Sequence, residues 1–443
     1  MWQSMAVFLV PLMLSNLLQS ASQTVNSIYI GRLLGVVDLA AISSIFPIVF
    51  LLISFLIGLA SGSTVLIGQA FGAGKRERVV EIAGTTLSLS VSLGVVVAFT
   101  GWFFGAAMLR AIGTPPTVLP LAVDYARVLF VLLPILFVYL VYSTFLRGVG
   151  DTRTPFVVLI AGTVLNLILT PLFIEGWLGA PKLGLPGAAV ATGLANALAT
   201  AGMCVYLLRV RHPLAPDRMF LTHLVPHPKI IAAVVRLGIP TGLQLIMVSL
   251  SEIAVISFVN RYGADATASY GAVNQIVSYV QFPAISIGIT CSIFGAQSIG
   301  AGRASRLGRI VRTGLLLNLV IGGVLIGLGY ALSWALLGLF LTSEPTLVLA
   351  HSLLAITLWS YLVFGSASVL SATMRSSGDV IWPTLLSVGS IWGIEVPVAY
   401  SLSHRIGIDG IWIAYPVAFI CLLILQTTYY RVFWKRRRIV ALA

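Results

Sequence analysis

Long apolar stretches separated by short polar turns occupy almost the whole chain. A hydropathy reading with a window of about 19 residues predicts about twelve membrane spans, each near the length that a bilayer needs. The predicted limits are 5–30, 41–71, 82–108, 122–146, 154–175, 186–208, 230–259, 267–299, 310–340, 347–374, 380–403 and 408–433. A transmembrane β-barrel is excluded, because its strands would alternate apolar and polar positions over about ten residues. The pattern therefore predicts an all-α integral membrane protein.

The composition strengthens this interpretation. Of the 443 residues, 58% are hydrophobic and 9% are charged, whereas an average soluble domain is about 25% charged. A soluble fold of this composition would expose large apolar patches. Cys204, Cys291 and Cys421 stand singly in apolar runs, without the spacing of a disulfide framework or of metal ligands. We therefore expect no soluble domain, no cofactor and no structural metal.

The formal net charge of +13 reflects membrane topology rather than nucleic-acid binding. The loops that follow even-numbered spans, together with the C-terminus, hold 20 of the 26 Lys and Arg residues. This asymmetry follows the positive-inside rule, so both termini are expected to be cytoplasmic in a multi-pass protein of the cytoplasmic (inner) membrane. The segment from Trp434 to Arg438 is expected to lie against anionic lipid headgroups. Membrane lipids, and not nucleic acid, are the expected macromolecular surroundings.

One pattern occurs twice along the chain. Residues Gln69–Lys75 (QAFGAGK) match Gln297–Arg303 (QSIGAGR) at an offset of 228 residues. The further matches are Arg147, Gly150, Asp151 and Pro155 with Arg375, Gly378, Asp379 and Pro383, Gly35 with Gly263, and Pro11 with Pro240 to within one residue. Six predicted spans separate the copies, so both halves enter the membrane in the same direction. The duplication predicts two six-helix lobes related by a pseudo-two-fold axis along the membrane normal.

This duplication sets the expected domain organisation. Residues 1–208 form an N-terminal lobe, 209–229 a polar cytoplasmic linker, 230–434 a C-terminal lobe and 435–443 a basic cytoplasmic tail. Transporters built from such repeats place substrate and ion sites at or near the repeat interface. We expect the same of this chain, acting as a monomer.

The ordered motifs resemble those of a known family. The residues that carry the resemblance are Pro11–Met13, Gly31–Leu33 with Gly35, Gln69–Gly74, Arg147–Pro155, and Asn166 with Pro171. They are similar to the multidrug and toxic compound extrusion (MATE) family of the MOP flippase superfamily, with its bacterial NorM-like and DinF-like branches. The resemblance covers essentially the whole chain. It implies a V-shaped, two-lobed exporter that exchanges H⁺ or Na⁺ for organic, often cationic, compounds by alternating access.

Two of the 13 acidic residues lie inside predicted spans, Glu252 in span 7 and Glu395 in span 11. A charge at bilayer depth is costly, so such residues usually face a cavity and usually act in transport. For Glu395 a structural role stays open, because its carboxyl could satisfy backbone groups that Pro397 frees. Glu252 is predicted as the cation-coupling group, binding H⁺ or Na⁺, with Glu395 as its partner. A carboxylate that binds either the cation or the drug, and never both, is sufficient for antiport.

The N-terminal lobe departs from the family pattern. The resemblance implies an acid in span 1, where this chain has Asn26, and for the DinF-like branch an acid four residues after Asn166, where it has Thr170. Asn26, Asn166 and Thr170 therefore form a predicted polar site that cannot titrate. The NorM-like branch implies an acid at Val248; Glu252 lies one helical turn later, on the same face.

Aromatic and amide side chains in neighbouring spans could complete a cavity for an organic cation. Aromatic faces beside a carboxylate attract such cations, although ordinary helix packing is the alternative for each residue. The candidates for the substrate cavity are Tyr139, Tyr142, Asn274, Gln275, Tyr279, Gln281, Trp359, Tyr361 and Trp392.

The sequence thus predicts a non-enzymatic secondary exporter of amphipathic or cationic drug-like compounds. No phosphate-binding Gly-rich loop with Lys-Ser/Thr is present, which argues against an ATP pump. A lipid-linked oligosaccharide or lipid flippase of the same superfamily is the alternative, but it would favour basic residues inside the spans. A membrane-embedded enzyme is disfavoured because the five histidines are scattered near loops or span ends. The duplication makes a receptor or channel the weakest of the alternatives.

Overall fold

The computed structural model describes residues 1–437 and 439–442, and every regular element among them is a helix. Eleven helices are long and apolar enough to cross a membrane, and one pair bent by 40° makes a twelfth candidate span. These observations confirm the predicted all-α membrane fold. Arg438, counted above in the basic tail, lies outside the described residues.

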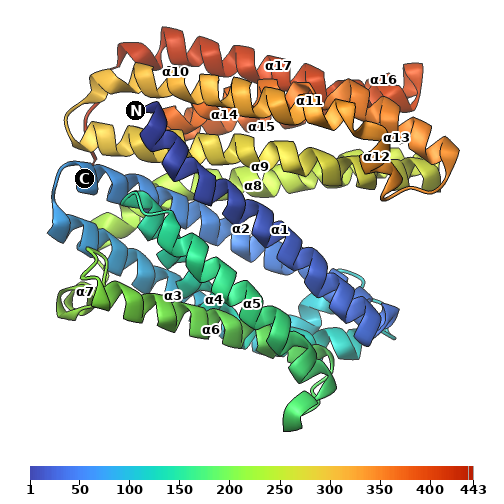
Figure 1. Cartoon of the computed structure of the whole chain (residues 1–443), viewed down its shortest axis with the longest axis horizontal. Coiled ribbons are helices and arrows are strands. Elements are labelled where there is room, and N and C mark those ends of the chain that lie inside the picture. The colour runs from blue at the N-terminus through green and yellow to red at the C-terminus, as the bar shows by residue number, and fades with distance from the viewer. Residues whose placement is uncertain (438, 443) are drawn as a thin grey trace. The chain divides into compact units, whose positions relative to one another are not determined.

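The first six spans are single continuous helices (Figure 1). They are α1 (Trp2–Leu33), α2 (Val36–Gly72), α3 (Arg76–Ala111), α4 (Leu119–Gly148), α5 (Arg153–Glu175) and α6 (Leu185–Arg209). The predicted spans lie inside these helices and are shorter, because hydropathy detects the apolar middle of a helix and not its polar ends.

The second six spans are more often interrupted. They are α8 (Pro228–Val259), α9 (Ala264–Gly300), α10 (Leu307–Leu317) continued by α11 (Gly323–Ala331), α13 (Glu344–Thr357) with α14 (Ser360–Ser376), α15 (Ile381–Ser390) continued by α16 (Val396–Ile406), and α17 (Ile408–Val432). Short π-helical segments, η4 (Asn318–Gly322) and η5 (Ile391–Glu395), join the two continued pairs. The short α12 (Ser333–Gly338) lies between α11 and α13.

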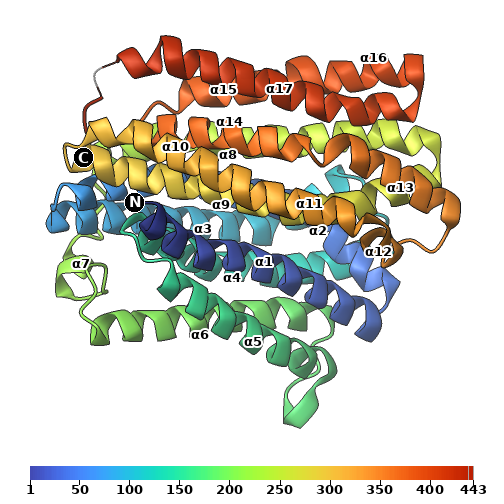
Figure 2. The ribbon, with the colours of Figure 1, turned by 45° about the horizontal axis from the view of Figure 1, so that its top comes forward.

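The helices pack as two compact units. One consists of Leu14–Gly242, and the other combines Met1–Met13 with Leu243–Ala443. In the first unit α4 packs against α2, α3 and α6, while α5 packs against α6. In the second unit α14 packs against α9, α10 and α17, and Figure 2 shows α15 and α16 running beside α17. The fourth span of each repeat thus has equivalent neighbours, as a duplicated bundle requires. This is a division by packing, and the domain limits drawn from the repeat stay a prediction.

A matched turn separates the first two spans of each repeat. Gly35 precedes α2 with φ 97°, and Gly263 precedes α9 with φ 95°. Residues with a Cβ rarely adopt this conformation. The sequence match between these two glycines therefore corresponds to the same backbone geometry in both halves.

The segment between α6 and α8, predicted as a polar linker, is held against the first unit. Leu214 and Phe220 are buried, and the Tyr142 hydroxyl on α4 donates a hydrogen bond to the Leu214 carbonyl. The helix α7 (Arg218–Thr222) packs against α3 and is capped by Asp217, whose Oδ1 accepts from the Phe220 N–H at 2.9 Å. The linker therefore has fixed contacts along its length and is not a free tether.

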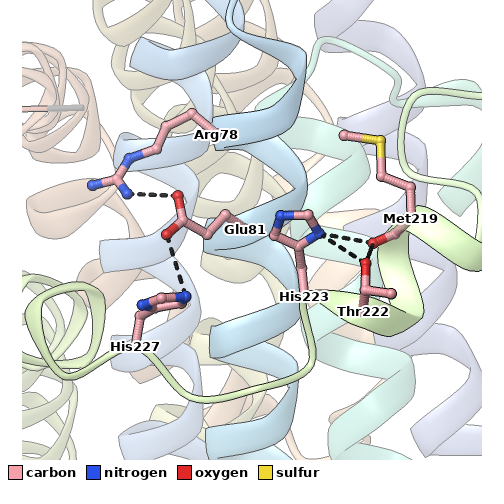
Figure 3. A network of polar contacts seen from close by, with 6 residues as sticks. All are labelled: Arg78, Glu81, Met219, Thr222, His223 and His227. Atoms are coloured by element: carbon pink, nitrogen blue, oxygen red, sulfur yellow. Dashed lines mark hydrogen bonds and ion pairs between the residues drawn. The ribbon is translucent and has the colours of Figure 1, made fainter.

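Polar contacts at the end of this segment reach α3 (Figure 3). Glu81 pairs with Arg78 at 2.6 Å and with the His227 ring at 3.6 Å. His223 Nδ1 lies 2.8 Å from the Met219 carbonyl oxygen within the linker itself. The His223 carbonyl in turn packs directly over Gly84, where a Cβ would clash with it.

Candidate functional site

The two membrane-embedded glutamates lie close together in the second unit. Glu252 is on α8 and Glu395 is the last residue of η5, and their carboxyl groups interact electrostatically. Glu395 is 5% exposed, whereas the Glu252 side chain is accessible. Among the described residues, neither glutamate forms an ion pair with a Lys, Arg or His. The pair is therefore an uncompensated concentration of negative charge.

Three tyrosines from three helices surround this pair. Tyr270 on α9, Tyr361 on α14 and Tyr415 on α17 each interact electrostatically with Glu395, and the first two also with Glu252. The hydroxyl oxygens of Tyr270 and Tyr415 are 2.9 Å apart. We call Glu252, Glu395, Tyr270, Tyr361 and Tyr415 the acid–tyrosine cluster.

An aromatic layer supports this cluster. The Tyr270 ring stacks on Trp412 with a centroid distance of 6.0 Å and an interplanar angle of 12°. Tyr361 meets Phe419 edge to face at 5.3 Å. Trp412 is fully buried, and its Nε1 has no hydrogen-bond partner in the described part of the chain. Side chains locked in such packing hold the hydroxyl groups in defined positions.

The π-helical segment η5 positions Glu395. A π-helical turn places one extra residue in a helix, and such turns are frequent at functional sites. Ser390, just before η5, donates to the Ala418 carbonyl at 2.8 Å, and Trp392 Nε1 donates to the Met247 carbonyl at 3.1 Å. The Glu395 carboxylate accepts no hydrogen bond from the described residues, so they give no sign that it caps the backbone freed by Pro397.

The extra residue also explains the register of the repeat. Pro383 matches Pro155 at an offset of 228 residues, and η5 lies after this proline. One added residue raises the offset to 229, at which Glu395 corresponds to Asn166. Pro240 and Pro11 are also 229 residues apart, and at that offset Glu252 corresponds to Gln23. Each acid of the cluster therefore has a neutral amide as its counterpart in the first half.

In the first unit, Asn166 and Thr170 of the predicted polar site lie together. The Asn166 side-chain oxygen accepts from the hydroxyls of Thr170 at 3.2 Å and Thr192 at 3.3 Å, and Asn166 and Thr170 are buried. The Asn26 side-chain oxygen on α1 is buried and has no hydrogen-bond partner among the residues described. We call Asn166, Thr170 and Thr192 the amide–threonine cluster; Asn26 is not hydrogen-bonded to it.

The other predicted cavity residues fall into different surroundings. Asn274 is hydrogen-bonded to Tyr270, and Trp392 lies in η5, so both adjoin the acid–tyrosine cluster. Tyr142 holds the linker, which gives it a structural role instead of the expected cavity role. The remaining candidates are Tyr139, which is buried in α4, Gln275 and Gln281, which are partly buried in α9, and Tyr279 and Trp359, which are exposed.

Sequence reasoning missed Tyr270, Tyr415 and Thr192. Tyr270 lies four residues before Asn274, which places both on one face of α9. That spacing could have indicated Tyr270, since Asn274 was already a candidate. Tyr415 and Thr192 carry no comparable signal. Among the described residues, no group of three or more His, Cys, Asp or Glu could hold a metal ion.

Comparisons with known sequences agree with this architecture. The MatE family model matches the chain twice, over residues 11–172 and 240–401. The probable multidrug resistance protein YoeA of Bacillus subtilis is 52% identical over 443 residues, covering 100% of this chain and 96% of YoeA. An FAD transporter of Shewanella oneidensis is 25% identical over 386 residues, covering 87% of this chain and 84% of the relative.

Solved structures show the same fold. The Vibrio cholerae MATE transporter VcmN superposes with a TM-score of 0.90 at 20% identity, covering 99% of this chain and 98% of VcmN. A MOP superfamily transporter from Pyrococcus furiosus gives a TM-score of 0.88 at 22% identity, covering 98% and 96% of the two chains. The repeat, the membrane helices and the double family match lead to one conclusion: the chain belongs to the MatE family of multi-pass membrane transporters.

Proposed function

We propose that this transporter is a multidrug exporter that exchanges H⁺ or Na⁺ for amphipathic or cationic organic compounds by alternating access. The coupling group is the Glu252–Glu395 pair. The observation that carries this proposal is that two carboxyl groups on membrane-spanning helices interact with each other and have no basic partner among the described residues.

Electrostatics then supplies the mechanism. Two carboxylates held close together out of water repel each other, so the doubly ionised pair is stable only with a positive species bound. A proton, a sodium ion or an organic cation can each fill this requirement. Entry of the coupling cation from outside neutralises the pair and releases the drug; its loss to the cytoplasm restores the negative site. The ion gradient provides the free energy.

The aromatic layer indicates the substrate class. Tyr270, Tyr361 and their ring partners offer π faces beside negative charge, a combination that attracts organic cations. An anionic substrate such as FAD, which the Shewanella oneidensis relative is named for, would be repelled by the same two carboxylates. A flippase for pyrophosphate-linked lipids is disfavoured for the same reason.

The surroundings follow from the charge asymmetry of the loops. We place the protein in the cytoplasmic membrane with both termini in the cytoplasm, where the basic loops face anionic lipid. It acts as a monomer, without a cofactor and without enzymatic chemistry.

Efflux measurements test this proposal. Cells producing wild type, Glu252→Gln or Glu395→Gln are loaded with ethidium or norfloxacin, and gradient-driven export is followed by fluorescence. Both variants keep the side-chain shape and lose the charge, so export is expected to fall to the level of cells without the transporter. Repeating the assay at fixed pH with and without Na⁺ identifies the coupling ion.

Glu344→Gln is the matched control, because Glu344 is exposed at the start of α13, outside the acid–tyrosine cluster. It should export as wild type does. Normal gradient-driven export by both Glu252→Gln and Glu395→Gln would overturn the proposed mechanism. Loss of export in Glu395→Gln alone would leave Glu395 as the coupling group.

A further inference from the structure

A groove lies between the beginning of α10 and the end of α17, within the second unit. Its volume is about 450 Å³. The residues that line it are Gly308, Val311, Arg312, Leu315, Leu316, Leu319, Tyr430, Arg431 and Lys435. Three of these are cations and none is acidic. The transport mechanism proposed above makes no use of this groove.

The lining residues divide into a charged end and an apolar end. Gly308, Arg312, Leu315 and Leu319 follow one face of α10 at helical spacing. Leu319 lies about 10 Å further along the helix axis than Arg312, at 1.5 Å per residue. Leu316 and Leu319 are 53% and 56% exposed, so the apolar end is open to the hydrocarbon region. Arg431 and Lys435 join Arg312 at the charged end.

The neighbouring tail is fixed, which leaves Lys435 available to the groove. Trp434 is buried, and its Nε1 donates to the Ser377 hydroxyl at 2.9 Å. Arg437 pairs with Asp379 at 3.4 Å, and the Tyr429 hydroxyl donates to the same carboxylate at 2.7 Å. Trp434 and Arg437 thus face inward, unlike the headgroup contacts expected of them. Asp379, the acid in this region, is engaged by these partners and not by the groove cations.

Helix electrostatics accounts for only part of this charge. A cation near the C-terminus of α17 is favoured by the helix dipole, which explains Arg431. The same dipole gives no reason for Arg312, which lies near the N-terminal end of α10. Basic pockets between transmembrane helices on the cytoplasmic side are typical binding places for acidic lipid headgroups.

We propose that this groove binds an anionic phospholipid of the cytoplasmic leaflet. The phosphate lies among Arg312, Arg431 and Lys435, and one acyl chain lies along Leu315, Leu316 and Leu319. The ligand class is a glycerophospholipid with net negative charge, such as phosphatidylglycerol. The site is separate from the acid–tyrosine cluster, so it stands or falls independently of the export mechanism.

Native mass spectrometry of the purified protein in detergent tests this assignment. Wild type is titrated with dioleoyl phosphatidylglycerol, and the bound fraction is compared with that of Arg312→Gln/Lys435→Gln. Removing two groove cations is expected to weaken binding by roughly 10- to 30-fold. The control is Arg309→Gln/Arg436→Gln, which removes two exposed cations from the same end of the unit that do not line the groove. It should bind the lipid as wild type does.

A steric variant separates the groove from its charges. A Cβ at Gly308 would meet no other atom within 4 Å, so Gly308→Leu should fold and fill the charged end of the groove. We expect it to lose lipid binding while keeping every cation. Gly327→Leu, at an equally open glycine of the same span outside the groove, should retain it.

Several outcomes would overturn the proposal. Equal loss in the two charge variants would mean general electrostatic attraction. Equal binding of dioleoyl phosphatidylcholine would mean an apolar groove without headgroup recognition. Competition by millimolar inorganic phosphate alone would identify a free-anion site instead of a lipid site.

Discussion

The two halves of this transporter carry the same scaffold and opposite electrostatics. In the first half Asn166, Thr170 and Thr192 satisfy one another through neutral hydrogen bonds. In the second half Glu252 and Glu395 lie among three tyrosines, with no basic partner in the part of the chain that the structure describes. Duplication preserved the helix packing, whereas the ionisable groups are concentrated in one copy. This difference assigns coupling to the second half.

The backbone differs at the same place as the chemistry. The helix that carries Asn166 is continuous, while the helix that carries Glu395 contains the π-helical segment η5. The added residue aligns Glu395 with the position of Asn166 in the repeat. A change of one residue in the backbone and one carboxyl group in the side chain therefore separates a structural amide from a candidate coupling acid.

Moving the acid from one half to the other is expected to have the largest effect. The double variant Glu395→Gln/Asn166→Glu keeps the total charge but separates the two carboxyl groups and places one among threonines. Export of ethidium should be lost and not rescued by the new acid. Restored gradient-driven export would show that either half can couple, which contradicts the comparison.

Removing the extra residue of η5 should have a similar but slightly smaller effect. Deleting Gly393, which has open space where a Cβ would be, restores the shorter repeat and turns the following helix by about 100° relative to the preceding one. Glu395 would then leave the tyrosines, and export should fall strongly. Size-exclusion chromatography must show a folded protein, and unchanged export would mean that the π-helical turn has no role in coupling.

Tyr270→Phe should have an intermediate effect. It removes the hydroxyl that lies 2.9 Å from that of Tyr415 and keeps the ring on Trp412. Loss of one hydrogen bond, about 0.5–1.5 kcal/mol, should weaken the binding of an organic cation roughly two- to tenfold. Tyr400→Phe is a matched control on the exposed face of α16. Equal dissociation constants for wild type and Tyr270→Phe would remove Tyr270 from the site.

Asn166→Ala should have the smallest effect on transport. It leaves the Thr170 and Thr192 hydroxyls without their shared acceptor, although Thr192 keeps its bond to the Ala188 carbonyl at 3.0 Å. The expected result is a loss of stability of about 1–2 kcal/mol, measured as a lower unfolding temperature in detergent, with export close to that of wild type. Export as low as that of Glu395→Gln would place coupling in both halves.

Most of the fold could be predicted from the sequence, because the bilayer selects for long apolar helices and because the repeat is visible as matched motifs. The acids were also recognisable, since a carboxyl group inside an apolar run is rare enough to stand out. The MatE match and the all-helical structure confirm the family and the architecture.

Other features depend on packing that the sequence does not reveal. The π-helical turns leave no hydropathy signal, because Asn318–Gly322 and Ile391–Glu395 lie within otherwise apolar spans. Tyr415 looks like any other aromatic residue of a membrane helix until its contacts are known. The linker was predicted from its polar composition, but isolated apolar residues such as Leu214 and Phe220 bury it against the first unit.

Competition between ions and substrate tests the central claim most directly. The affinity of the purified protein for tetraphenylphosphonium is measured by equilibrium binding while pH and Na⁺ concentration are varied. We expect H⁺ or Na⁺ to weaken binding to wild type and to Asn166→Ala, and to have no such effect on what binding remains in Glu252→Gln/Glu395→Gln. Undiminished competition in that double variant would show that the exchanged cation binds elsewhere.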